Sequence, residues 1–168
     1  MLAKGKPMEN NEVIEFNGHI LPVKEFLDSA FRIATRSRCI KRKVGAEILW
    51  LNKFAWCYVG SGFNRTKNKC HQNCQRAESA SGRDMDKCPA IHAEIDAISR
   101  LRKLQNMEPK IKKTKNLIMV VTTHPCMECC KAIAETNISA VYYSDPYYKQ
   151  EEAEKLAPKV RFVRYEIK

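Results

Sequence analysis

Residues 117–136 read LIMVVTTHPCMECCKAIAET, and this stretch decides what kind of fold the chain adopts. Its first five residues are continuously apolar, which is typical of a short buried strand. Residues 127–136 fit a helix that begins just after Pro125 and Cys126. A strand that gives way to a helix within a few residues is typical of domains in which helices cover a central sheet.

The same alternation extends outward from this stretch. Helical spacing of apolar residues predicts further helices at residues 22–38, 90–104 and 150–156. Apolar and aromatic runs predict a hairpin and two later strands at residues 44–51, 54–60, 140–143 and 160–165. Residues 61–89 show no periodicity. We therefore predict a three-layer α/β/α fold with a mixed central sheet of about five strands. Residues 1–19 are expected to form a loose extension, and residues 20–168 one domain.

Composition narrows the class of protein. The chain has 168 residues, of which 44% are apolar and 29% charged, and its net charge is +11. The apolar stretches are strand-sized and the first twenty residues lack a signal-peptide core, so we expect a cytoplasmic protein that makes no membrane contact. The positive charge suits either a polyanionic partner or simple solvation of a basic surface. Eight cysteines in such a chain favour metal ligation or packing over disulfides.

Two short runs carry the chemistry. His92 opens the predicted helix at residues 90–104, and Cys126 and Cys129 lie one turn apart at the start of another. One imidazole and two thiolates suit tetrahedral zinc and leave a fourth position for water. Glu94 is poorly spaced to be a second ligand, but it suits a general acid and base beside the metal. A histidine two residues before a glutamate, as in His92-x-Glu94, followed by Pro125-Cys126-x-x-Cys129, is typical of zinc nucleobase deaminases.

Each run has a plainer interpretation when taken alone. A single histidine in a helix is more often structural than a ligand, and Cys126-x-x-Cys129 also suits a redox pair or a structural zinc site. The two runs together, within an alternating helix and strand frame, favour a catalytic zinc.

The chain resembles the deoxycytidylate deaminase family, within the cytidine deaminase-like superfamily, from about Phe26 to the C-terminus. The matching segments are residues 36–39 (RSRC), 44–46 (VGA), 62–64 (GFN), 92–98 (HAEIDAI) and 144–147 (SDPY). The resemblance implies zinc-dependent hydrolytic deamination of deoxycytidylate by a homo-oligomer with the cytidine deaminase-like fold. It also implies that Asn64 contacts the sugar hydroxyl, that backbone groups near Ala93 hold the base and that Tyr147 lies near the nucleotide. Candidates for the 5′-phosphate are Arg36, Arg38 and Lys43.

The chain departs from the family pattern at three positions near these segments. Phe63 replaces the usual tyrosine, Arg65 replaces a glycine and Asp96 replaces an asparagine. Arg65 is expected either to add a phosphate contact or to shift the choice of substrate. Asp96 is expected at the surface or as a helix cap. A glycine-rich turn that binds a triphosphate regulator in some members is poorly matched here.

A second, structural zinc is a further expectation. Some members of the family carry one in this region, with a ligand at the position of Cys39. The other candidate ligands are Cys70, Cys74 and Cys88, with His71 as an alternate. Four thiolates on one zinc would hold the long segment 61–89 in shape. The alternative is that these cysteines are free buried thiols.

Two other functions remain open at this point. A deaminase of bases in RNA or single-stranded DNA would use the same zinc site, and the charge of +11 suits it. Against it, aromatic residues do not alternate with basic residues as they do in single-strand-binding surfaces, so nucleic acid is not the expected partner. A zinc-stabilised binding module without catalysis would have closed coordination and no use for Glu94.

Overall fold

The computed structural model describes residues 14–66, 74–80 and 83–167. Five strands form the central sheet, in the order β4-β3-β5-β6-β7. They are β3 (Gly45–Leu51), β4 (Trp56–Phe63), β5 (Leu117–Thr123), β6 (Ile138–Asp145) and β7 (Arg161–Arg164). The pairs β4/β3 and β3/β5 are antiparallel, whereas β5/β6 and β6/β7 are parallel. The prediction of a mixed five-stranded sheet is confirmed.

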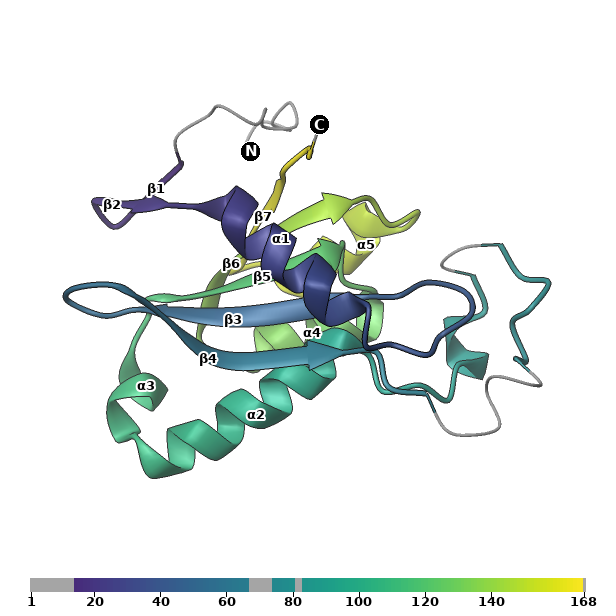
Figure 1. Ribbon diagram of the computed structural model, residues 1–168, viewed down its shortest axis with the longest axis horizontal. Coiled ribbons are helices and arrows are strands. Elements are labelled where there is room, and N and C mark those ends of the chain that lie inside the picture. The colour runs from purple at the N-terminus through teal and green to yellow at the C-terminus, as the bar shows by residue number, and fades with distance from the viewer. Residues whose placement is uncertain (1–13, 67–73, 81–82, 168) are drawn as a thin grey trace.

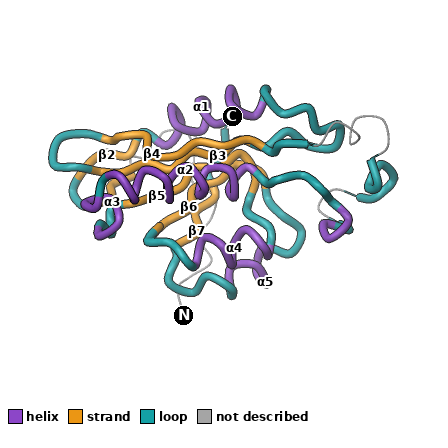
Figure 2. Tube along the Cα trace, turned by 90° about the horizontal axis from the view of Figure 1, so that it is seen from below, coloured by secondary structure: helices purple, strands orange, loops and turns teal. Residues whose placement is uncertain are grey.

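Helices cover both faces of this sheet, as Figures 1 and 2 show. One face carries α1 (Val23–Ala34). The other carries α2 (Ala93–Met107), α3 (Pro109–Lys113), α4 (Met127–Ala134) and α5 (Gln150–Glu154). The strand β5 is buried along its whole length because helices pack on both of its sides, which is why its sequence is continuously apolar. The three-layer α/β/α prediction is therefore confirmed.

A short hairpin and a short helix lie outside the predicted pattern. Residues 14–21 form a hairpin of β1 (Ile14–Phe16) and β2 (His19–Leu21), so the part of the expected loose extension that the structure describes is ordered. Phe16 packs against Trp56 of β4, which attaches the hairpin to the domain. The short α3 begins at Pro109, where a fixed φ suits the first helical turn and starts a new helix directly after α2.

The candidate functional residues lie at one end of the sheet. The parallel strands β5 and β6 both have their carboxyl ends there, with Thr123 paired to Asp145. The first turn of α2 reaches the same end of the sheet because α2 packs very closely against β4. A side chain at Gly62 would meet the Ala93 carbonyl at 2.3 Å, so glycine is required for this approach. Ligands in open α/β sheets commonly bind beyond the carboxyl ends of the strands.

Candidate metal centre and substrate cavity

His92, Cys126 and Cys129 meet where two helices begin. His92 is the N-cap of α2, Cys126 is the N-cap of α4, and Cys129 lies in the first turns of α4. The His92 Nδ1 atom is 3.3 Å from Cys126 Sγ and 3.2 Å from Cys129 Sγ, and all three donor atoms lie within 4.8 Å of one another. Tetrahedral zinc needs donor separations of about 3.5–3.8 Å. The three side chains fit a zinc ion, and within the described residues no fourth side chain joins the cluster.

The two cysteines differ in charge in the absence of a metal. The hydrogen bond from Cys129, assisted by His92, lowers the pKa of Cys126 to about 4. The same hydrogen bond with Cys126, together with burial, raises the pKa of Cys129 well above its usual value. Helix N-termini favour anions, so the start of α4 supports the Cys126 thiolate. A bound cation would complete the second deprotonation.

Glu94 lies beside these donors on the first turn of α2. Its side chain is buried, at 4% exposure, and it lines a cavity of 350 Å³ that His92 and Cys126 also line. Burial raises the pKa of Glu94 to about 7. A carboxyl group with such a pKa exchanges a proton readily at neutral pH, which suits general acid and base chemistry.

Three further residues that the sequence nominated line the same cavity: Asn64, Ala93 and Tyr147. The side chain of Asn64 already makes two hydrogen bonds, since its Oδ1 accepts from Val44 N at 2.8 Å and its Nδ2 donates to Arg42 O at 2.8 Å. One amide hydrogen and one lone pair remain for a ligand. Asn64 thus fixes the segment 42–44 as one wall of the cavity.

The basic residues around the cavity are not those that the sequence nominated. Arg36, Arg38 and Lys43 are exposed and do not line it. Lys41, Arg42 and Arg76 do. Lys41 Nζ donates to the carbonyl groups of Ala77 and Ser79, so it is occupied in holding the segment 74–80.

Arg76 was missed by sequence reasoning because residues 61–89 carry no periodicity from which burial can be inferred. It is 6% exposed, and its Nε donates to Arg83 O at 2.8 Å. It forms no ion pair with a carboxylate of the described residues, although its charge contributes to lowering the pKa of the exposed Asp84 after the hydrogen bond from Ser79. A buried arginine without a carboxylate partner is well suited to an anionic ligand.

His124 is a second cavity residue that the sequence did not nominate. Its ring stacks on that of Tyr147 with an interplanar angle of 7°, and its Nε2 lies 3.1 Å from Glu154 Oε1. The signal was its place directly before Pro125 and Cys126, which brings it to the strand end. His124 thereby fixes the tyrosine wall of the cavity.

The two charged departures from the family pattern, Arg65 and Asp96, meet each other. Arg65 NH2 lies 2.7 Å from Asp96 Oδ1, and the Asp96 side chain is 3% exposed. Arg65 does not line the cavity. The expectation that Asp96 lies at the surface or caps the helix is wrong, because Asp96 is buried against β4 and pairs with a cation.

The cysteines nominated for a second zinc do not form a metal cluster among the described residues. Cys39 and Cys88 both line the cavity, whereas Cys74 does not. Cys70 and His71 lie outside the described residues. The second zinc therefore stays a prediction. Cys130 of α4 is buried and packs against Ala153 of α5.

Comparison with known proteins matches this chain to the cytidine and deoxycytidylate deaminases. The family model for the cytidine and deoxycytidylate deaminase zinc-binding region matches residues 22–145. The deoxycytidylate deaminase of Saccharomyces cerevisiae is 30% identical over 135 residues, which cover 78% of this chain and 40% of the yeast protein. The deoxycytidylate deaminase of Schizosaccharomyces pombe is 30% identical over 128 residues, 73% of this chain and 36% of that protein. The chain thus spans about two fifths of the length of these yeast relatives.

One further relative supports the same family, and one solved structure shares the fold. The human deoxycytidylate deaminase is 33% identical over 132 residues, covering 76% of this chain and 67% of the human protein. The crystal structure of dCMP deaminase from the cyanophage S-TIM5 in complex with dCMP and dUMP covers 87% of this chain and 99% of that chain, with a TM-score of 0.60 and 24% identity.

The mixed sheet and its flanking helices define the cytidine deaminase-like class of fold. Within that class, this chain belongs to the cytidine and deoxycytidylate deaminase zinc-binding family. Among the residues that the structure describes, none of the helices has the length and apolarity needed to cross a bilayer.

Proposed function

We propose that this chain is a zinc-dependent hydrolase that converts deoxycytidylate to deoxyuridylate. The observation that carries the proposal is the meeting of His92, Cys126 and Cys129 beside the buried Glu94 at one cavity. The family supports a deaminase, and the relatives from yeast and human, which are deoxycytidylate deaminases, support the choice of substrate.

His92, Cys126 and Cys129 would hold the zinc ion, since one imidazole and two thiol groups within 4.8 Å of one another are a donor set typical of a catalytic zinc site. Zinc in such a site acidifies water and so supplies a nucleophile near neutral pH. Glu94 would take one proton from the attacking water and pass it to the ring nitrogen. It would then take the second proton from the hydroxyl group now bonded to the ring carbon and pass it to the amine, which leaves as ammonia. Its pKa of about 7, which is raised by burial, suits both halves of this task.

The cavity walls would orient the nucleotide. Backbone groups near Ala93 hold the base, and the remaining amide positions of Asn64 contact the sugar hydroxyl. The ring of Tyr147, fixed by His124, closes the opposite side. These roles follow the positions of the side chains around the cavity and the family resemblance.

Arg42 and Arg76, which line the cavity, are the better candidates for the 5′-phosphate, in place of Arg36, Arg38 and Lys43, which do not line it. The guanidinium of Arg76 is buried and has no described carboxylate within ion-pair distance, and that of Arg42 makes a long hydrogen bond of 3.4 Å to Thr123. A phosphate would satisfy both groups, because arginine matches its oxygens in pairs.

A substrate panel tests the proposal through the fall in ultraviolet absorbance on deamination. The purified protein with one zinc at the active site should deaminate deoxycytidylate faster than deoxycytidine, the deoxycytidine triphosphate or a cytosine-containing single-stranded oligonucleotide. Arg76→Gln should raise KM for deoxycytidylate about 10- to 100-fold, the range expected for loss of a charged hydrogen bond. It should leave KM for deoxycytidine unchanged, because deoxycytidine has no phosphate. Activity on the oligonucleotide alone would overturn the proposal in favour of a nucleic-acid deaminase. No activity on any cytosine compound would favour a zinc-stabilised binding module.

We also propose that the enzyme acts as a homo-oligomer in the cytoplasm on a free nucleotide, and that it binds a second zinc through Cys39, Cys70, Cys74 and Cys88, with His71 as an alternate. Metal analysis of the purified protein should then give two zinc ions per chain. Replacement of Cys74 by serine should reduce the content to one, whereas a content of one in the parent protein would remove the second site.

A further inference from the structure

Arg65 contacts the chain on both sides of His92, at Ile91 before α2 and at Asp96 within α2. Its backbone N donates to Ile91 O at 2.9 Å, and its own carbonyl accepts from Ile91 N at 3.0 Å. These two bonds form an isolated antiparallel bridge next to the metal-binding histidine. The Arg65 guanidinium then reaches Asp96, four residues after His92, at 2.7 Å. The segment that contains His92 and Glu94 is therefore held at two points by one residue.

Asp96 depends on Arg65 for its partner. Its Oδ1 accepts from Arg65, whereas its Oδ2 is buried and has no hydrogen-bond partner among the described residues. Arg100 NH2, at 3.8 Å from Oδ2, is too distant for a hydrogen bond. A buried carboxylate that loses its close partner is strongly unfavourable, because the remaining charge is poorly solvated.

Asn64, the residue before Arg65, connects these contacts to the other side of the cavity. Its amide groups bind Val44 N and Arg42 O, and its backbone carbonyl accepts from Ser37 Oγ at 2.7 Å. Residues 64 and 65 thus join the 42–44 wall to the helix that carries a zinc donor and the proton-transfer carboxylate.

We propose that Arg65 is a positioning residue that, through Asp96, fixes His92 and Glu94 against the cavity wall formed around Asn64. Its consequence for catalysis rests on the proposed function, whereas its consequence for the metal donors does not. The two departures from the family pattern thus meet in one ion pair of this chain. Either single reversion breaks the pair, and Arg65→Gly breaks it more severely because Asp96 is the buried partner.

The test uses the zinc-loaded protein and the variants Arg65→Gly, Asp96→Asn, the double variant of these two, and Arg65→Lys. The rate of zinc transfer to a chromophoric chelator is the first readout. Arg65→Gly should release zinc about 10-fold faster, at the lower end of the effects of residues that orient metal ligands. In the double variant the rate of zinc transfer should return to within about threefold of that of the parent, because Asp96→Asn removes the buried charge that Arg65→Gly leaves without its cation. Arg65→Lys, which keeps a cation, should also stay within about threefold.

Deamination gives the second readout. Arg65→Gly should lower kcat about 10-fold and change KM less than about twofold, because His92 and Glu94 move while the proposed phosphate-binding residues Arg42 and Arg76 stay in place. Leu49→Ala is the matched control: it truncates the core on the α1 face and destabilises the fold without touching the site. If Leu49→Ala speeds zinc release as much as Arg65→Gly does, or if the double variant behaves like Arg65→Gly, the positioning role is overturned. If zinc transfer follows the expected pattern while the parent deaminates no nucleotide, the proposed function fails and the positioning role stands.

Discussion

Glu94 and Asp96 are two buried carboxylates in the first turn of α2, and their surroundings differ completely. Glu94 lines the cavity, forms no ion pair with a described residue, and has a pKa that burial raises to about 7. Asp96 points to the opposite side of the turn and lies 2.7 Å from the guanidinium of Arg65. One turn of helix therefore holds a carboxyl group suited to proton transfer beside a carboxylate fixed by a cation. Burial alone does not distinguish a catalytic carboxylate from a structural one; the partner does.

The largest expected effect separates these two carboxylates by the same change of acid to amide. Glu94→Gln keeps the size of the side chain and removes its ability to carry protons, so kcat for deoxycytidylate should fall about 10³-fold. Asp96→Asn should lower kcat less than about tenfold, because an amide oxygen still accepts a hydrogen bond from Arg65. Steady-state kinetics on samples with matched zinc content gives both values. Full activity in Glu94→Gln would show that Glu94 carries no proton in the reaction.

The next effect is the loss of folding stability when Asp96 loses its close partner, Arg65. Arg65→Leu removes the cation, and we expect the free energy of unfolding to fall by about 2 kcal/mol, less than for a fully buried pair because the arginine is half exposed. Urea unfolding measures the change. Adding Asp96→Asn to Arg65→Leu should recover most of the loss. An unchanged stability in Arg65→Leu would mean that Arg100 or water solvates Asp96 well enough.

Glu47 on β3 extends the comparison to the opposite face of the sheet. It is buried, its Oε1 accepts from Ser29 Oγ at 2.9 Å, its Oε2 has no described hydrogen-bond partner, and burial raises its pKa above 4.5. The folded protein binds this proton more tightly than the unfolded chain does. The stability that Glu47 confers is thus complete below pH 4.5 and is lost as the pH rises through the raised pKa.

Glu47→Gln should consequently be more stable than the parent at pH 7 by about 1 kcal/mol, because no charge is buried. The difference should vanish as the pH falls to 4.5. Urea unfolding at several pH values measures it, with the exposed Glu15→Gln as the control that should show no such trend. If Glu47→Gln is less stable at pH 7 and the gap narrows toward acid, the carboxylate is stabilised in the fold and the sign is wrong.

The sequence predicted the fold and the meeting of His92, Cys126 and Cys129 because both have local signatures. Strand β5 is apolar throughout because it is buried on both sides, and His92, Cys126 and Cys129 occur within short runs at helix starts. Asp96 was misjudged because its partner is Arg65, thirty-one positions earlier in the chain, and the contact depends on how β4 packs against α2. The phosphate candidates were chosen as basic residues near a matching motif, whereas the buried Arg76 comes from a segment without periodicity. Long-range pairing of charged groups leaves no local pattern to read.

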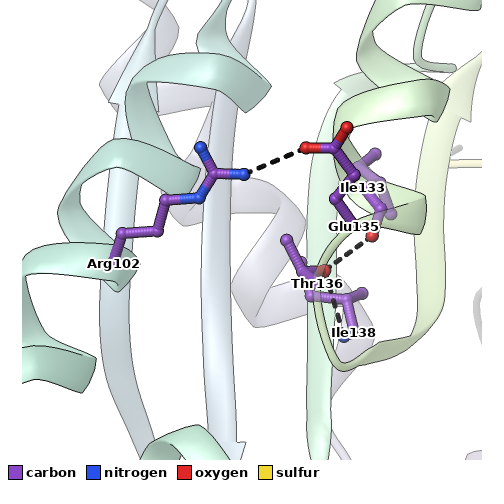
Figure 3. A network of polar contacts seen from close by, with 5 residues as sticks. All are labelled: Arg102, Ile133, Glu135, Thr136 and Ile138. Atoms are coloured by element: carbon purple, nitrogen blue, oxygen red, sulfur yellow. Dashed lines mark hydrogen bonds and ion pairs between the residues drawn. The ribbon is translucent and has the colours of Figure 1, made fainter.

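The smallest expected effect comes from an ion pair at the far end of α2. Arg102 and Glu135 face each other across the two helices (Figure 3). Arg102 NH2 lies 3.3 Å from Glu135 Oε2, but the two side chains are 57% and 72% exposed. Water solvates both groups when the pair is broken, so Arg102→Ala should change the free energy of unfolding by less than about 0.5 kcal/mol. The turn after α4 has a separate support beside this pair: Thr136 Oγ1 donates to Ile133 O at 2.7 Å and accepts from Ile138 N at 3.1 Å. Thr136→Val, which removes both bonds, should cost about 1 kcal/mol in the same urea experiment. A loss in Arg102→Ala as large as that in Arg65→Leu would mean that burial does not govern the strength of these pairs, and the contrast between Asp96 and the surface charges would fail.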